Sequence, residues 1–321
     1  MSSEKEEKKE EKKEEKLKYI FGPVPSRRLG ESLGVSPIPE KTCNYSCVYC
    51  QLGRTNKRIA ERKEYFPLEK ILEEFDSIEN VDSKCDVITI VGEGDPSLYS
   101  RLGDLIIELQ LRTEKPVAVI TNGALLSSEE VRNELLSADI VLPSLDSTNE
   151  LMWKKVDRPH HDLNFNDVYQ GLITFSQEYK GQLYMELMLM DGINDDEENI
   201  QAFKKLLEPV RYDRIYINTP VRPPAESFVH ESKPEAIARA VEVLGGISID
   251  SLAAGTFGSD IADDYEALLS IIGRHPMNQH EIGSFLASRN NSAPEEIFNR
   301  LNMDENVEKL EYKGYITYHK L

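Results

Sequence analysis

Between residues 33 and 217, short apolar segments alternate with longer amphipathic ones, and this alternation restricts the fold more than any other feature of the sequence. The apolar segments predict strands at 33–38, 86–91, 116–121, 140–142, 183–189 and 214–217. The segments between them predict helices at 68–78, 98–111, 165–179 and 197–207, and one more that begins at a capping box of Ser127 and Glu130. Such alternation implies parallel strands joined by helical crossovers, and therefore an α/β fold.

Three of the four cysteines lie in one loop, directly after the first predicted strand. Cys43, Cys47 and Cys50 have the spacing C-x3-C-x2-C, which lets their thiolates converge on one soft metal centre. A structural zinc site usually needs two separated ligand pairs, and the sequence has no second cysteine pair. A cubane iron–sulfur cluster normally takes four cysteines, so three would leave one iron open. The alternative is a chance grouping of reduced structural cysteines.

With Tyr49 directly before the last cysteine, this motif resembles the signature of the radical S-adenosylmethionine (SAM) superfamily. The resemblance implies a partial (β/α)6 TIM-type barrel, a [4Fe-4S] cluster held by Cys43, Cys47 and Cys50, and SAM bound at the open iron. It also implies an enzyme that needs a low-potential electron donor of the ferredoxin or flavodoxin type. Such an enzyme cleaves SAM reductively to a 5′-deoxyadenosyl radical, which abstracts hydrogen from a substrate.

Residues 21–53 closely resemble a group classed near the wyosine tRNA-modification enzymes. The wyosine enzymes carry further cluster cysteines or a flavodoxin-like domain, and neither is visible here. The resemblance therefore indicates modification of tRNA or protein as the reaction class, without naming the substrate. The alternative function is an iron–sulfur redox-sensing regulator that reads DNA through its C-terminal part.

Polar residues follow the predicted strands, at the end of a parallel barrel where loops form active sites. Gly92-Glu93-Gly94-Asp95 resembles the glycine-glycine-glutamate motif that binds the amino group of SAM, with a simple strand-to-helix turn as the alternative. The resemblance implies further cofactor-binding residues, several of which have a capping or turn role as the alternative: Tyr49, Asn122, Ser144, Asp146 and Asn218.

Several basic side chains have two open interpretations. Arg27 and Arg28 lie in a segment at 21–30 that is expected to be a fixed loop, and they could bind an anion or pair with surface carboxylates. Arg158, His160 and His161 could bind a substrate anion or a metal, although solvated loop histidines are the commoner outcome.

Four further residues are expected to have structural roles. A Glu186 that faces the barrel interior would need a partner. We expect Met188 and Met190 to fill the core, and Cys85 to be a buried, inert thiol.

The sequence divides into a charged tail at 1–18, a barrel with its extension at 19–273, and a small winged-helix-like domain at 274–321. The tail is rich in Lys and Glu and is expected to be disordered. Expected helices at 278–288, 294–301 and 307–313 precede a strand at 315–319, which resembles a winged helix. Residues 252–257 are ambiguous between strand and loop.

The net charge of −19 counts against extended, nonspecific nucleic-acid binding. From residue 275 on, five Lys and Arg face seven Asp and Glu, which favours protein contact or substrate presentation over DNA binding. No apolar run approaches the roughly 20 residues of a membrane helix, and the N-terminus lacks the apolar core of a signal peptide. We therefore expect a cytoplasmic protein without a membrane partner.

Overall fold

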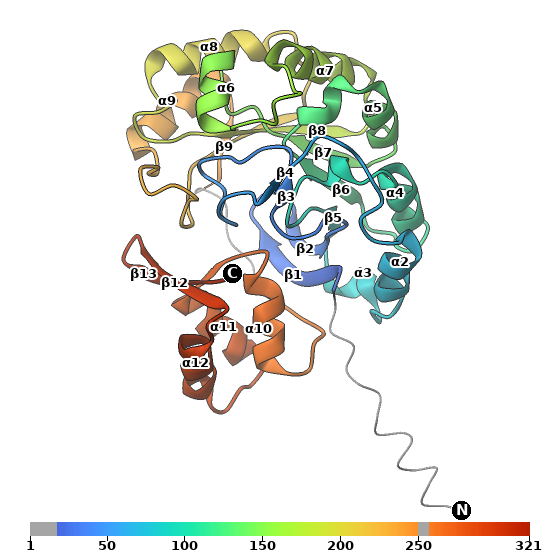
Figure 1. Cartoon of the computed structure of the whole chain (residues 1–321), viewed down its shortest axis with the longest axis vertical. Helices are drawn as coiled ribbons and strands as arrows, with labels where there is room; N and C mark the ends of the chain where they lie inside the picture. The colour runs from blue at the N-terminus through green and yellow to red at the C-terminus, as the bar shows by residue number, and fades with distance from the viewer. Residues whose placement is uncertain (1–17, 250–256) are drawn as a thin grey trace, which may run out of the picture.

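The computed structural model describes residues 18–249 and 257–321 (Figure 1). Most strands form one curved sheet with helices on its outer side, and the C-terminal elements form a smaller group beside the start of that sheet. The expected disordered tail and the ambiguous segment at 252–257 lie outside the described residues, apart from Lys18 and Phe257.

The large sheet has eight strands in the order β1-β2-β5-β6-β7-β8-β9-β10. From β2 onward neighbouring strands pair in parallel, whereas β1 pairs antiparallel with β2. The strands are Ile20–Ser26 (β1), Gly30–Val35 (β2), Val87–Ile90 (β5), Val117–Thr121 (β6), Ile140–Pro143 (β7), Gln182–Met188 (β8), Arg214–Asn218 (β9) and Ile247–Ser248 (β10). The predicted parallel strands are confirmed as β2 and β5 to β9. Within the described residues β1 and β10 do not pair with each other, so the barrel is partial.

Helices connect the parallel strands and cover the outer face of the sheet (Figure 1). A continuous core lies between them, in which Ile88 and Ile90 of β5 pack with Leu105 and Leu109 of α4. All residues of β5 are buried, as expected for a parallel strand covered on both faces. The helices are α2 (Leu68–Asp76), α3 (Val81–Lys84), α4 (Leu102–Gln110), α5 (Glu129–Leu135), α6 (Glu150–Val156), α7 (Phe165–Glu178), α8 (Glu197–Leu207) and α9 (Pro234–Leu244), with short 3-10 turns at η2 (Pro96–Leu98) and η3 (Ala124–Ser127).

The expectation of a fixed loop at 21–30 is wrong, because β1 occupies most of this segment. Proline cannot donate to a neighbouring strand, so prolines at 23 and 25 argue against a central strand. They are tolerated because β1 is the edge strand, with an irregular register between Phe21 and Val24.

The boundaries around α5 and α6 also differ from expectation. The predicted capping box at Ser127 is absent, because Ser127 ends η3 and α5 begins at Glu129 without a side-chain cap. Leu125 and Leu126 are buried in η3, so apolar packing fixes this turn. Helix α6 was not predicted, although Asn149 accepts a hydrogen bond as its N-cap and could have indicated its start.

The C-terminal elements have their own apolar core, formed with residues of β1. The expected helix at 307–313 is wrong: this segment is strand β12, which pairs with β13 from end to end. The turn residues Lys313 and Gly314 both have positive φ, as a two-residue hairpin turn requires. The elements are α10 (Asp264–Ile272), β11 (Met277–Asn278), α11 (Gln279–Ser288), α12 (Pro294–Met303), β12 (Val307–Tyr312) and β13 (Tyr315–Lys320). Three helices and a β-hairpin are thus present, and the winged-helix assignment and the domain boundaries stay predictions.

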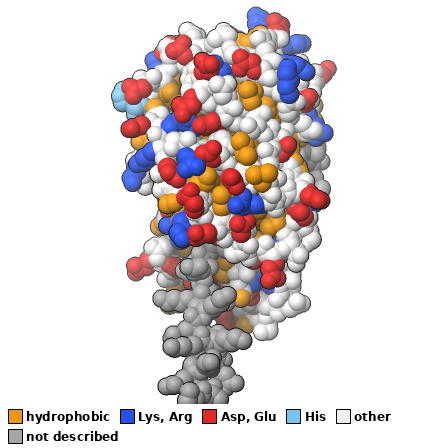
Figure 2. All heavy atoms as spheres, turned by 90° about the vertical axis from the view of Figure 1, so that its right-hand side faces the viewer, with side chains coloured by type: hydrophobic (Ala, Val, Ile, Leu, Met, Phe, Trp, Pro, Cys, Tyr) orange, Lys and Arg blue, Asp and Glu red, His pale blue; other side chains and the backbone are white. Residues whose placement is uncertain are grey.

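No helix in the described ranges is long and apolar enough to cross a membrane. On the face shown in Figure 2, Lys and Arg side chains lie among Asp and Glu, and no continuous basic patch forms. This face therefore offers no basic surface for extended binding of nucleic acid.

Candidate functional site

The cysteine loop begins at the short strand β3 (Thr42–Cys43), which pairs with β4 (Lys57–Arg58), and distant segments fix its shape. The Ser46 amide donates to the Asp157 carbonyl at 3.0 Å, on the segment after α6. The Val48 carbonyl accepts from the Glu226 amide at 3.1 Å, on the segment after β9. The conformation of the loop therefore depends on the folded barrel around it.

The three thiols of the loop are free, partly exposed and close to acidic groups. Burial raises the pKa of the Cys43 thiol to about 12, and the charge of Asp95 adds to this effect. Burial and then the charge of Asp157 raise the pKa of Cys47 well above its usual range. Burial also raises the pKa of Cys50. Thiolates at this place therefore need a positive centre beside them, which is what a metal cluster provides.

The spacing of the three sulfur atoms distinguishes between kinds of metal site. Among the described His, Cys, Asp and Glu side chains, the loop cysteines do not form a group with all ligand atoms within 4.8 Å of one another. A single zinc ion, with Zn–S bonds of about 2.3 Å, would hold its thiolates closer than that. A cubane binds each cysteine at a different iron and so spans a wider set of ligands. With three cysteines in the loop, a cubane bound here would keep one iron without a protein ligand from the loop.

Gly92 and Gly94, which follow β5, let their own backbone lie close to the chain that leads into the cysteine loop. An added Cβ at Gly94 would lie 1.7 Å from the carbonyl oxygen of Thr42. At Gly92 it would lie 2.2 Å from the hydroxyl of Ser36. Gly92 and Gly94 are therefore required because their backbone packs directly against the chain that leads into the loop, where a side chain has no room.

The two acidic residues of the same motif have different surroundings. Glu93 accepts a hydrogen bond from the Ser36 hydroxyl at 2.7 Å, and its other oxygen lies 3.4 Å from Nε of Arg274, just before β11. The carboxylate of Asp95 is buried and accepts hydrogen bonds from Ser97, Thr121 and Asn122. Asp95 therefore joins the ends of β5 and β6, whereas Glu93 lies at the boundary with the C-terminal elements.

Two buried carboxylates lie beside the loop. Asp146 accepts from the hydroxyl of Tyr49 and from a backbone amide of β8, and burial raises its pKa to about 6. Asp157 accepts from the Ser147 hydroxyl at 2.7 Å and lies 3.8 Å from the sulfur of Cys47. Burial and then the charge of Asp146 raise the pKa of Asp157. Sequence reasoning found Tyr49 and Asp146 but missed Asp157, because Asp157 follows the unpredicted helix α6.

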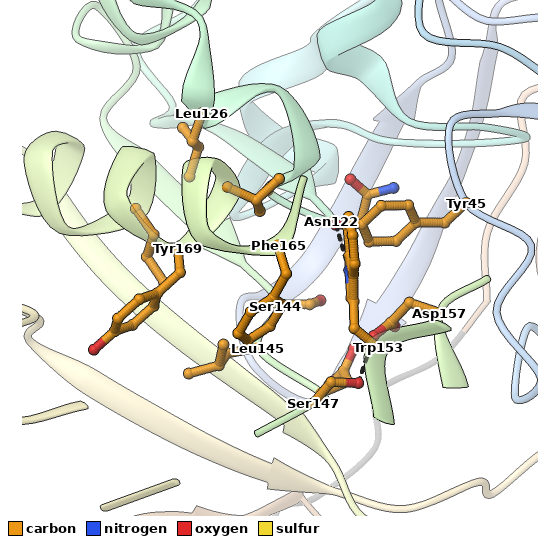
Figure 3. A pocket seen from close by; sticks show the side chains of 14 residues that line it. Tyr45, Asn122, Leu126, Ser144, Leu145, Ser147, Trp153, Asp157, Phe165 and Tyr169 are labelled. Atoms are coloured by element: carbon orange, nitrogen blue, oxygen red, sulfur yellow. Dashed lines mark hydrogen bonds between the residues drawn. The ribbon is translucent and has the colours of Figure 1, made fainter. Parts of the chain in front are cut away.

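A cavity lies next to these carboxylates, beside α7 (Figure 3). The Trp153 indole, which lines it, donates to the hydroxyl of Tyr45 in the cysteine loop at 3.0 Å. The lining combines polar groups that follow β6, β7 and α6 with aromatic rings: Asn122, Ser144, Asp146, Ser147, Asp157, Tyr45, Trp153, Phe165 and Tyr169. The structure thus brings three of the predicted cofactor-binding residues, Asn122, Ser144 and Asp146, to one cavity.

Asn218, at the end of β9, belongs to a different polar network. Its Nδ2 donates to Glu186 at 3.4 Å, and Glu186 also pairs with Arg28 from the turn before β2. Arg28 is therefore the partner that a buried Glu186 needs. It pairs with this largely buried carboxylate, whereas the expected alternative to anion binding was a pair with a surface carboxylate. Burial lowers the pKa of Arg28 to about 10.

Arg158, His160 and His161 lie on the loop after α6. Arg158 pairs with Glu226. Nδ1 of His160 and Nε2 of His161 lie 3.5 and 3.3 Å from the carboxylate of Asp162. The ring of His161 is 81% exposed, as expected for a solvated loop histidine.

Met190 and Cys85 have the structural roles that were predicted. Met190 is fully buried and packs with Val48 beneath the cysteine loop. Cys85 is 4% exposed and lies at the opposite end of β5 from Gly92, where its thiol donates to the Val81 carbonyl at 3.5 Å.

Comparison with known proteins identifies the family. Residues 38–203, which include the whole cysteine loop, match the family model described as the radical SAM superfamily. The chain belongs to the radical SAM superfamily. Radical SAM proteins are enzymes that use a [4Fe-4S] cluster and SAM, so the predicted enzyme class and cofactors are confirmed.

The most similar relatives extend beyond the matched region. UPF0026 protein MJ1312 of Methanocaldococcus jannaschii is 36% identical over 314 residues, which cover 94% of this chain and 95% of the relative. A UPF0026 protein of Helicobacter pylori is 32% identical and covers 83% of this chain and 87% of the relative.

A solved structure of a radical SAM protein shares the fold of this chain. A radical SAM methyltransferase from Sphaerobacter thermophilus has a TM-score of 0.51 and 16% identity, covering 70% of this chain and 68% of that chain. A TYW1 structure with a lysine-pyruvate adduct has a TM-score of 0.49 and 19% identity, covering 70% and 75% of the two chains.

Proposed function

We propose that this radical SAM enzyme binds one [4Fe-4S] cluster through Cys43, Cys47 and Cys50, and that it modifies a macromolecule, tRNA or protein. The observation that supports the cluster assignment is the loop itself, which holds three free, partly exposed thiols within eight residues. When bound, the cluster and SAM supply reductive cleavage of SAM and abstraction of hydrogen from the substrate. A low-potential donor of the ferredoxin or flavodoxin type supplies the electron.

The chain's own residues bind and orient the cofactor in this proposal. Glu93 accepts from the amino group of SAM, because its carboxylate is less occupied by protein donors than that of Asp95. Asp95 positions the end of β6, and Gly92 and Gly94 let the motif lie against the cysteine loop. The remaining residues proposed to line the cofactor and substrate site are Tyr49, Asn122, Ser144, Asp146 and Asn218.

The position of the C-terminal elements supports a macromolecular substrate. Nε of Arg222, after β9, donates to the Pro276 carbonyl at 2.7 Å. The hydroxyl of Tyr312, at the end of β12, donates to the Pro220 carbonyl at 2.7 Å. With the Glu93–Arg274 pair, these contacts join the C-terminal elements to the loops after β5 and β9. A winged-helix-like domain at this place would hold a large substrate at the mouth of the barrel.

Release of 5′-deoxyadenosine tests the proposed cluster. Reconstituted protein given dithionite and SAM should release it, and replacing Cys43, Cys47 or Cys50 with Ala should abolish both the release and the cluster signal in electron paramagnetic resonance (EPR). Cys85→Ser is the matched control and should keep about four irons per chain. A redox-sensing regulator would release no 5′-deoxyadenosine, and a Cys85 variant without a cluster would contradict the assignment of ligands.

The substrate class needs a separate experiment. Modified nucleosides and modified peptides should be compared between a strain that lacks the protein and its parent. We expect one macromolecular modification to disappear in the deletion strain. The free thiols of the loop require a reducing compartment, which supports the proposed cytoplasmic location.

A further inference from the structure

The stretch around the cluster cysteines has a charge opposite to that of the whole chain. Residues 41–60 contain four Lys or Arg and no Asp or Glu, whereas the chain has a net charge of −19. These basic residues are Lys41, Arg54, Lys57 and Arg58. All but Lys41 are exposed, so their charge faces solvent beside the cysteine loop. The surroundings of the cysteines are therefore a positive region on an otherwise acidic protein.

Three arginines gather in this region around one carboxylate. Arg54 and Arg158 both pair with Glu226, whose side chain is only 8% exposed. Nη1 of Arg58 donates to the carbonyl of Arg158 at 3.1 Å, and no carboxylate in the described part of the chain pairs with Arg58. Three positive charges thus meet one negative charge. We refer to Arg54, Arg58 and Arg158 as the arginine cluster.

The arginine cluster is attached directly to the loop of proposed cluster ligands. Arg58 is the pairing partner of Cys43 between β3 and β4. Arg54 follows a turn that begins at Cys50, whose carbonyl accepts from the Gly53 amide at 3.1 Å. An added Cβ at Gly53 would meet no atom within 4 Å, so this turn faces open space. A partner that contacts the arginine cluster would therefore lie against the cysteine loop itself.

The backbone of Arg158 is held in an unfavourable conformation. Its φ is 47°, in the left-handed region that residues other than glycine seldom adopt. Its amide donates to the Trp153 carbonyl at 3.1 Å, directly after α6, where a helix usually ends in glycine or asparagine. Backbone strain of this kind is found preferentially at functional sites, which fits a role for the side chain of Arg158.

We propose that the arginine cluster is the docking surface for an acidic redox protein that delivers the electron to the iron–sulfur cluster. This inference rests on the proposed three-cysteine cluster and its low-potential donor. One electron passes from the reduced cofactor of the donor to the oxidised cluster, so the donor is oxidised and the cluster reduced by one electron. Carboxylates of the donor pair with the guanidinium groups, and this charge complementarity orients the donor at the cysteine loop.

The distribution of charge favours an acidic protein over RNA at this surface. Nonspecific affinity for nucleic acid depends on neutralising many phosphate groups along the backbone. The arginine cluster is small, the chain has a net charge of −19, and the face in Figure 2 has no continuous basic patch that could extend the contact. Electron-transfer encounters bury less than about 1,200 Å², so a small surface is sufficient for them.

The effect of salt on the rate of reduction tests the proposal in the unaltered protein. Reconstituted protein with an oxidised cluster is mixed anaerobically with a reduced acidic flavodoxin, and the flavin absorbance gives the rate. Attraction by the arginine cluster should make this rate fall as the ionic strength rises. If the net charge of −19 governed the encounter, salt would screen a repulsion and the rate would rise. A rising rate, or no reduction by flavodoxin where dithionite reduces the cluster, would overturn the proposal.

Substitutions then locate the docking surface. The double variant Arg54→Gln, Arg58→Gln removes two exposed charges and leaves Arg158 as the partner of Glu226. Its control is Lys204→Gln, Lys205→Gln, which removes the same charge from exposed positions of α8. At low ionic strength we expect the rate with flavodoxin to fall about tenfold in the arginine variant and to stay nearly unchanged in the control.

Dithionite provides the comparison that a structural role would not pass. With excess dithionite and SAM, both double variants should release 5′-deoxyadenosine at the wild-type rate and contain normal iron. An equal loss with flavodoxin and with dithionite would mean that the arginines only stabilise the site, and it would overturn the proposal. Unchanged reduction by flavodoxin in the arginine variant would overturn it as well.

Two further outcomes are distinguishable. Loss of binding to total tRNA in a mobility-shift assay, with normal reduction by flavodoxin, would show that the surface binds nucleic acid and that the proposal is wrong. Failure of the proposed three-cysteine cluster looks different, because the wild-type protein would then give no EPR signal that depends on Cys43 and would release no 5′-deoxyadenosine with dithionite. That result would overturn both proposals together.

Discussion

The substitution Gly94→Ala tests whether close backbone packing beside the cysteine loop is needed for stability and for the cluster. An added Cβ at Gly94 would lie 1.7 Å from the carbonyl oxygen of Thr42 and 2.6 Å from Cγ2 of Ile38. The first of these is a backbone atom of β3, whose position is fixed by pairing with β4. Relief of the clash therefore requires a backbone shift of more than about 1 Å, because nonbonded carbon–oxygen contacts are normally about 3.3 Å or longer.

This shift has a cost in stability and a consequence for the cluster. Overpacking of a well-packed site typically costs about 1–3 kcal/mol. Because the obstacle is backbone and cannot rotate away, we expect the free energy of unfolding to fall by about 3 kcal/mol or more. Thr42 directly precedes Cys43, so the first cluster ligand would move with it, and the iron bound per chain should fall.

Two measurements check this prediction, with Gly283→Ala as the control. Urea unfolding of the cluster-free protein gives the loss of stability, and iron analysis after anaerobic reconstitution gives the loss of cluster. Gly283 lies inside α11, and an added Cβ there meets no atom within 4 Å. The control should be neutral or more stable by about 0.5–1 kcal/mol, since Ala is the better helix former. A Gly94→Ala protein with wild-type stability and full iron would refute the reasoning.

Three further predictions concern ionisable groups around the site. Glu93→Gln should weaken SAM binding in a calorimetric titration while iron stays near normal. Unchanged affinity would mean that Glu93 does not bind SAM and only forms its ion pair with Arg274. Hydrogen bonds from Arg54 and Arg158 lower the pKa of Glu226 to about 2, so its stabilising effect is present above about pH 4.5 and lost as the pH falls toward 2. The stability difference between wild type and Glu226→Gln in urea should shrink over that range. Burial lowers the pKa of His319 to about 4, so the free energy of unfolding should fall as the pH drops from 6.5 to 4, and His319→Gln should lose this dependence.

The parallel strands could be predicted because their signal is local. A strand buried on both faces reads as a short run of β-branched residues, as Val87 to Ile90 do, and no distant partner is needed to recognise it. Strands β1 and β12 were missed for the opposite reason. Prolines in β1 are acceptable only at the edge of a sheet, and β12 is a strand because a hairpin turn at Lys313 and Gly314 pairs it with β13.

The sequence by itself determined the kind of chemistry. Three thiols within eight residues share a loop whatever the rest of the chain does, and their spacing alone indicates a metal cluster with an open position. Likewise, a glycine-rich turn after a buried strand must lie at the carboxyl end of a parallel sheet, where active sites form.

Only the tertiary structure decided what surrounds those thiols. Asn122 reaches Cys43 from the end of β6, Asp157 reaches Cys47 from the segment after α6, and Arg274 approaches Glu93 from the C-terminal elements. These partners are far apart in sequence, and any of them alone is an ordinary polar residue. They come together because the strands pair in one particular order, so the packing of the barrel determines the electrostatic environment of the site.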